Sequence, residues 1–148
     1  RVITERLAGW RDALTEAGID PLVVNQPDDY SPAPLAAARM LDGPDRPTAV
    51  LCLTDVLAQS VLAAASDAGL TVPDDLAVVG FDDHPLTLRT RPTLSTVRQD
   101  VDAKGRAAAR ALLRLVAGRA DSALSRPRSR RLPVQLAVRG STVGDGWR

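Results

Sequence analysis

The chain has 148 residues, of which 45% are hydrophobic and 25% are charged, as is usual for a globular protein of one domain. Its net charge of +1 provides no overall field that would attract nucleic acid or a membrane surface. The single Cys52 excludes an internal disulfide, and no stretch approaches the roughly 20 apolar residues that a membrane-spanning helix needs. Because the chain starts at Arg1 and enters a helical pattern almost at once, we expect it to be part of something longer.

Helical and strand patterns alternate along the chain. Apolar residues three to four positions apart predict helices at 7–17, 35–41, 57–68 and 101–117. Continuous apolar runs predict strands at 22–24, 48–53, 76–79, 94–97 and 132–138. Gly18, Gly69 and Gly118 stop three of the helices, and Asp100 caps the last one. The pattern predicts an α/β fold with an open parallel sheet flanked by helices on both faces, followed by a loose polar tail from Gly140 onward.

Polar side chains gather where the predicted strands end. Thr54 and Asp55 follow one strand, Asp82 follows the next, and Tyr30 lies in the loop after a third, while Arg6 in the first helical turn can reach the same edge. Ligands of open α/β sheets bind beyond the carboxyl ends of the strands. Carboxylates accept hydroxyl protons, a guanidinium donates to oxygens and an aromatic ring covers C–H groups, so this set suits a small polar molecule rich in hydroxyls.

Each of these residues also has a structural alternative. Asp55 is better explained as the N-cap of the next helix than as a ligand contact, and Thr54 is the other candidate for that cap. Asp82 is equally compatible with bonding to loop amides. Tyr30 suits packing onto the following helix, and Arg6 suits a solvated helix face.

Catalytic and metal motifs are missing from the sequence. Asp82, Asp83 and His84 are consecutive, and adjacent residues rarely converge on one ion; with one His and one Cys in the chain, we expect no metal site. No glycine-rich phosphate loop and no nucleophile elbow follow a strand. We therefore expect no cofactor and no enzyme activity.

Several motifs together resemble those of the lac-repressor/galactose-repressor (LacI/GalR) family of bacterial transcription regulators. The matching residues are Arg6 with Leu7-Ala8-Gly9-Trp10; Pro47-Thr48-Ala49-Val50 leading to Thr54-Asp55 and Ala58; Gly69-Leu70, Val72-Pro73-Asp74-Asp75-Leu76 and Val78-Val79-Gly80-Phe81-Asp82-Asp83; Pro92, Leu94-Ser95-Thr96-Val97-Arg98-Gln99-Asp100 and Gly105; and Leu136, Val138-Arg139-Gly140-Ser141-Thr142. The resemblance covers nearly the whole chain and is most specific from Pro47 to Gln99.

The resemblance implies a periplasmic-binding-protein-like type I domain, in which two α/β lobes enclose a cleft and the protein is a homodimer. This chain then holds an incomplete two-lobe domain. The implied parts are the C-terminal lobe at 1–100, a helix at 101–118 that packs with the N-terminal lobe, a basic loop at 119–131, a strand at 132–142 that returns to the C-terminal lobe, and a tail at 143–148.

The family's effector contacts fall on Arg6, Tyr30 and Asp82 of this sequence. Family members commonly carry Asn-Asp where this chain has Thr54-Asp55, so a hydroxyl replaces an amide at that contact. The implied function is a cytoplasmic sensor of a small polar effector, with carbohydrates as the indicated class, that acts on DNA through lobe closure and a headpiece outside this chain. The alternatives are a periplasmic sugar-binding protein of a transporter and, third, an enzyme of flavodoxin-like topology. The five arginines of segment 119–131 lack helical patterning and indicate a solvated loop, not a DNA-reading element.

Overall fold

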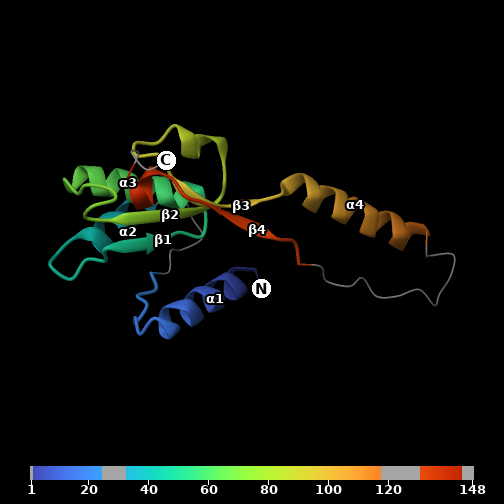
Figure 1. Ribbon diagram of the computed structural model, residues 1–148, viewed down its shortest axis with the longest axis horizontal. Coiled ribbons are helices and arrows are strands. Elements are labelled where there is room, and N and C mark those ends of the chain that lie inside the picture. The colour runs from blue at the N-terminus through green and yellow to red at the C-terminus, as the bar shows by residue number, and fades with distance from the viewer. Residues whose placement is uncertain (1, 25–32, 118–130, 145–148) are drawn as a thin grey trace.

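The computed structural model describes residues 2–24, 33–117 and 131–144 (Figure 1). The helices are α1 (Val2–Glu16), α2 (Ala33–Leu41), α3 (Asp55–Asp67), α4 (Val101–Ala117) and α5 (Gly140–Val143), with a 3-10 helix η1 (Pro85–Leu88). The strands are β1 (Ala49–Leu51), β2 (Ala77–Asp82), β3 (Ser95–Gln99) and β4 (Val134–Ala137). The predicted alternation of helices and strands is confirmed from α2 to β4.

The strands form one sheet in the order β1-β2-β3-β4. β1, β2 and β3 are parallel, with Leu51 opposite Val79 and Asp82 opposite Arg98, whereas β4 runs antiparallel to β3. The predicted α/β sheet is therefore confirmed as mostly parallel, with β4 as the exception. Parallel strands end at the same side of a sheet, so the chain that leaves β1, β2 and β3 does so at one common edge.

The core lies between the sheet and the pair of helices α2 and α3. Helix α3 begins at Thr54, whose side chain accepts a hydrogen bond from the Leu57 amide at 3.2 Å, and Gly69 follows its end with φ +69°. Ala58 and Ala65 of this helix are completely buried, and their small side chains let α3 approach β2 closely. The buried apolar residues are Ala37, Leu41, Cys52, Ala58, Val61, Leu62, Ala64, Ala65, Leu76, Val78 and Leu94.

Two sequence-based expectations about short segments are wrong. Residues 22–24 form no strand, since they pair with none of the four strands of the sheet, and Leu22 is 65% exposed. Residues 140–143 are not loose, since they form α5, in which Ser141 is fully buried, while residues 145–148 lie outside the described ranges. The Ser141 hydroxyl donates to the carbonyl of Val78 at 2.6 Å and accepts from the amide of Ser95 at 2.8 Å.

Helix α4 extends away from the sheet, and none of its residues is buried (Figure 1). The Asp100 carboxylate caps it, as predicted, by accepting a 2.7 Å hydrogen bond from the Ala103 amide. Leu112 and Leu113 are 61% and 67% exposed, so the apolar side of α4 has no partner in the described part of the chain. None of the helices in the described ranges combines the length and apolarity that a bilayer crossing demands.

Replacing Leu76 with alanine tests the assignment of the core. Leu76 is fully buried, so Leu76→Ala is expected to lower the free energy of unfolding by about 3 kcal/mol through lost burial and an unfilled cavity. Leu112→Ala, on the exposed side of α4, is the matched control and should change it by less than about 0.5 kcal/mol. Urea unfolding followed by circular dichroism measures both, and equal losses would contradict the proposed core.

Candidate functional site

Arg6 links α1 to the carboxyl edge of the sheet. Its Nη1 donates a 3.0 Å hydrogen bond to the carbonyl oxygen of Leu53, just beyond β1. Its guanidinium carbon lies 3.5 Å from the centre of the Phe81 ring, near the end of β2. This cation–π contact and the hydrogen bond orient the guanidinium, whose other N–H groups have no acceptor among the described residues.

Asp82 ends β2 at the same edge. Its carboxylate is exposed, and its Oδ1 accepts a 2.7 Å hydrogen bond from Nε2 of Gln99, the last residue of β3. The Gln99 Oε1 in turn accepts from Nζ of Lys104 on α4 at 3.3 Å. Within the described ranges, Asp82 Oδ2 has no protein partner, so this oxygen is available to accept hydrogen bonds from a ligand.

Thr54 and Asp55 have different tasks. The cap of α3 is Thr54, and the expectation that Asp55 is the cap is therefore wrong. Asp55 is 1% exposed and points under β2, where its Oδ2 accepts from the His84 amide at 2.7 Å and its Oδ1 accepts from Thr96 Oγ1 at 2.6 Å. Its carboxylate is thus fully engaged inside the protein and does not face the edge.

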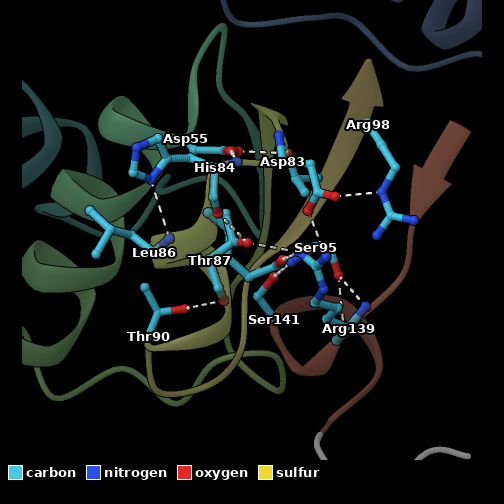
Figure 2. A network of polar contacts seen from close by, with 12 residues as sticks. Asp55, Asp83, His84, Leu86, Thr87, Thr90, Ser95, Arg98, Arg139 and Ser141 are labelled. Atoms are coloured by element: carbon cyan, nitrogen blue, oxygen red, sulfur yellow. Dashed lines mark hydrogen bonds and ion pairs between the residues drawn. The ribbon is translucent and has the colours of Figure 1, made fainter. Parts of the chain in front are cut away.

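Asp83 lies between two arginines, as Figure 2 shows. Arg139 Nη2 donates to Asp83 Oδ1 at 2.6 Å, and Arg98 Nε donates to Oδ2. Burial alone would raise the pKa of Asp83, but the hydrogen bonds and charges of Arg139 and Arg98 outweigh it and hold that pKa below its ordinary value. Arg139 also donates to the Leu94 carbonyl and to Thr87 Oγ1, so it ties the segment after β4 to the loop after β2.

The structure brings three of the candidate contacts to one edge of the sheet. Arg6 lies on the ring of Phe81, Asp82 is the next residue and ends β2, and Thr54 follows the carbonyl of Leu53 that Arg6 binds. Tyr30 lies outside the described residues. Sequence reasoning missed the roles of Phe81 and Gln99, although the position of Gln99 at a strand end was the signal that could have identified it.

Metal and thiol chemistry find little support at this edge. The described ranges contain no group of three or more His, Cys, Asp or Glu side chains placed to hold a metal ion. Burial, followed by the nearby charge of Asp55, raises the pKa of the Cys52 thiol to about 12. A thiol with such a pKa stays protonated at neutral pH and is a poor nucleophile.

Replacing Asp83 with asparagine tests its paired carboxylate. Asp83→Asn removes the charge between two arginines, and we expect it to lower the free energy of unfolding at pH 7 by about 2 kcal/mol. Because the folded-state pKa lies below the ordinary 3.8, this stabilisation is complete above pH 3.8 and is lost as the pH falls through the folded-state value. The difference between the two proteins should therefore narrow only below about pH 3.8.

Urea unfolding at pH 7, 5 and 3 measures this difference. Asp74→Asn, at an exposed acid before β2, is the matched control. Its free energy of unfolding should not differ from that of the wild type in this pH-dependent way. The ion pairs of Asp83 would be contradicted if the free energies of unfolding of the wild type and Asp83→Asn differed equally at all three pH values, or did not differ at pH 7.

Comparison with known proteins identifies the family. The model of the periplasmic binding protein-like domain matches residues 1–142. The transcriptional regulator MalR of Streptomyces coelicolor is 46% identical over 109 residues, which are 73% of this chain and 30% of that protein. The transcriptional repressor CytR of Escherichia coli is 37% identical over 140 residues, which are 93% of this chain and 40% of that protein. The chain thus spans less than half the length of these relatives.

Solved structures of regulators share the fold. A complex of the regulator CelR with cellobiose superimposes with a TM-score of 0.82 at 32% identity, covering 93% of this chain and 42% of CelR. A LacI family regulator from Arthrobacter in complex with lactose gives 0.75 at 33% identity, covering 88% and 48%. The lac repressor dimer bound to operator and an anti-inducer gives 0.80 at 32% identity, covering 94% and 47%.

The relatives are named as transcriptional regulators, not as enzymes. The resemblance of the sequence motifs is therefore confirmed across nearly the whole chain. The chain belongs to the periplasmic binding protein-like domain family, in the branch of the LacI/GalR transcriptional regulators.

Proposed function

We propose that this chain is the effector-sensing part of a LacI/GalR-type regulator and that it binds a carbohydrate at the carboxyl edge of the sheet. The observation that carries the proposal is that the Arg6 guanidinium, which lies on the Phe81 ring, and the exposed residue Asp82 are both found at the carboxyl end of β2. The regulators that match this chain in complex with cellobiose and with lactose support this ligand class.

Each proposed contact has a definite chemical capacity. Asp82 accepts hydroxyl protons through Oδ2, and Arg6 donates to ligand oxygens through the N–H groups that Leu53 does not use. Thr54 Oγ1 accepts from Leu57, so its own proton remains as a donor. Tyr30, by its place in the motif, supplies the aromatic face. Asp55 is left out of the contact set because both of its oxygens are engaged inside the protein.

The exposed apolar side of α4 supports the lobe assignment. We propose that residues 1–100 form the C-terminal lobe, that helix 101–118 packs with a second lobe, and that strand 132–142 returns to the first one. Because a ligand stabilises the state it binds best, closure of two lobes around the effector would shift the regulator between its DNA-binding states. The basic segment 119–131 and the tail 143–148 have no part in this proposal.

The same relatives also support a proposal for the wider assembly. We propose a cytoplasmic homodimer without enzyme activity, which contacts DNA only through a headpiece outside this chain. The lac repressor whose structure matches this chain was solved as a dimer on its operator, which supports this arrangement. A transporter's sugar-binding protein, the alternative with the same fold, is not favoured, because the named relatives are regulators.

Titration of the isotope-labelled chain with cellobiose and with lactose tests the ligand class and the site. The amide chemical shifts should change at Arg6, Thr54 and Gln99, and Asp82→Ala should weaken binding by about tenfold or more because it removes a charged hydrogen-bond acceptor.

The matched control is Asp74→Ala, which replaces an exposed acid at the amino end of β2 and should leave binding unchanged. Asp82→Ala without effect on binding would contradict the site. Wild-type protein that binds neither sugar would contradict the ligand class.

A further inference from the structure

We infer that Asp55 is a positioning residue for the effector site: its buried carboxylate holds the turn at residues 82–84 and so sets the direction of the Asp82 side chain. This inference rests on the proposed function only in taking Asp82 as an effector contact. Asp55 itself does not reach the site edge, since it is 1% exposed.

The turn after β2 has a backbone that needs external support. Asp82 and Asp83 have φ values of +114° and +58°, and they are the only residues other than glycine with positive φ in the described part of the chain. L-residues rarely adopt this region, and two consecutive ones persist only where the surrounding structure holds them. The side chain of Asp82 leaves the backbone inside this turn, so its direction depends on the turn.

The amides that follow Asp82 both lead to the carboxylate of Asp55. The His84 amide donates to Asp55 Oδ2 at 2.7 Å, as seen in Figure 2. The Asp83 amide donates to Thr96 Oγ1 at 3.3 Å, and that hydroxyl donates its proton to Asp55 Oδ1 at 2.6 Å. The carboxylate of Asp55 thereby accepts a hydrogen bond directly from the amide of His84. It holds the amide of Asp83 indirectly, through the hydroxyl of Thr96.

The position of Asp55 is stabilised by hydrogen bonds rather than by an ion pair. Within the described ranges, no cationic side chain forms a salt bridge with Asp55, and a buried carboxylate is tolerated only when its oxygens are hydrogen-bonded. Its place in the first turn of α3 also favours a negative charge. The amides and the hydroxyl around it are therefore required partners, which ties α3 to the turn.

Gly80 provides an independent indication that this contact is specific. A Cβ at this position would lie 2.2 Å from Asp55 Oδ1 and 3.2 Å from the Asp55 Cα. Only glycine at this point of β2 lets the carboxylate pass beneath the strand and reach the turn. A side chain that served only to cap α3 would need no such opening.

Hydrogen exchange tests the holding of the turn without any ligand. Thr96→Val removes the bridging hydroxyl at nearly constant volume, and we expect the Asp83 amide to exchange about tenfold faster or more. Asp55→Asn, a second variant of nearly the same shape, should accelerate exchange at Asp83 and His84. Thr96→Ser keeps the hydroxyl and should restore protection.

The matched control is Thr90→Val, which removes a hydroxyl that bonds to Thr87 in the same loop and does not contact Asp55. Amides in the middle of α3, such as that of Ala65, report on global opening, so the acceleration at Asp83 and His84 should exceed any acceleration at Ala65. Unchanged exchange at Asp83 and His84 in both Thr96→Val and Asp55→Asn would overturn the inference.

A double-mutant cycle with cellobiose as the probe tests the link to Asp82. Asp55→Asn should weaken binding by about tenfold in the wild-type background and by much less in the Asp82→Asn background, because it acts through Asp82. An equal loss in both backgrounds would overturn the positioning role, since a loss of general stability would affect them alike. Failure of the wild type to bind cellobiose would count against the proposed function. The hydrogen-exchange measurement, which needs no ligand, separately tests whether Asp55 and Thr96 hold the turn at residues 82–84.

Discussion

The buried carboxylate of Asp55 is the constraint on which the edge of the sheet depends. It joins the first turn of α3 to the loop after β2 and, through Thr96, to β3. A charge in such a position is costly unless every oxygen is hydrogen-bonded, so the three elements must stay in register for the carboxylate to be satisfied. The glycine at position 80 is part of the same constraint, because β2 must pass directly over this side chain.

A second polar network completes the other side of the same loop. Asp83 receives hydrogen bonds from Arg98 and Arg139, and Arg139 also binds the Leu94 carbonyl. The segment after β4 is therefore fastened to the loop by a charged pair whose side chains are only 14% and 13% exposed. Asp82 directly precedes the two anchored residues, Asp83 and His84. Among the described contacts, it is the one of the three whose side chain keeps an acceptor oxygen, Oδ2, without a protein partner.

Local signals in the sequence were enough for most of the fold and for part of the site. Gly69 as a helix stop and Asp100 as a cap depend on neighbouring residues, and both predictions are confirmed. The ends of the first two strands were predicted less well, because β1 ends at Leu51 and not at residue 53, and β2 continues to Asp82 and does not stop at residue 79. The role of Asp55 depends on His84 and Thr96, which lie 29 and 41 residues away, and no local pattern shows such pairings. The same holds for Ser141, whose partner Val78 is 63 residues away. Residues 22–24 show the reverse case, in which a strand-like pattern is not paired into the described sheet.

The side chain of Gln99 connects the candidate site to helix α4. It bonds Asp82 on one side and Lys104 of α4 on the other, and its backbone pairs with Val134 at the point where the chain leaves and re-enters the sheet. On the proposed two-lobe arrangement, that point is the hinge. The side chain of Gln99 thereby connects α4 to Asp82, the proposed effector contact, at the place where the proposed lobes join.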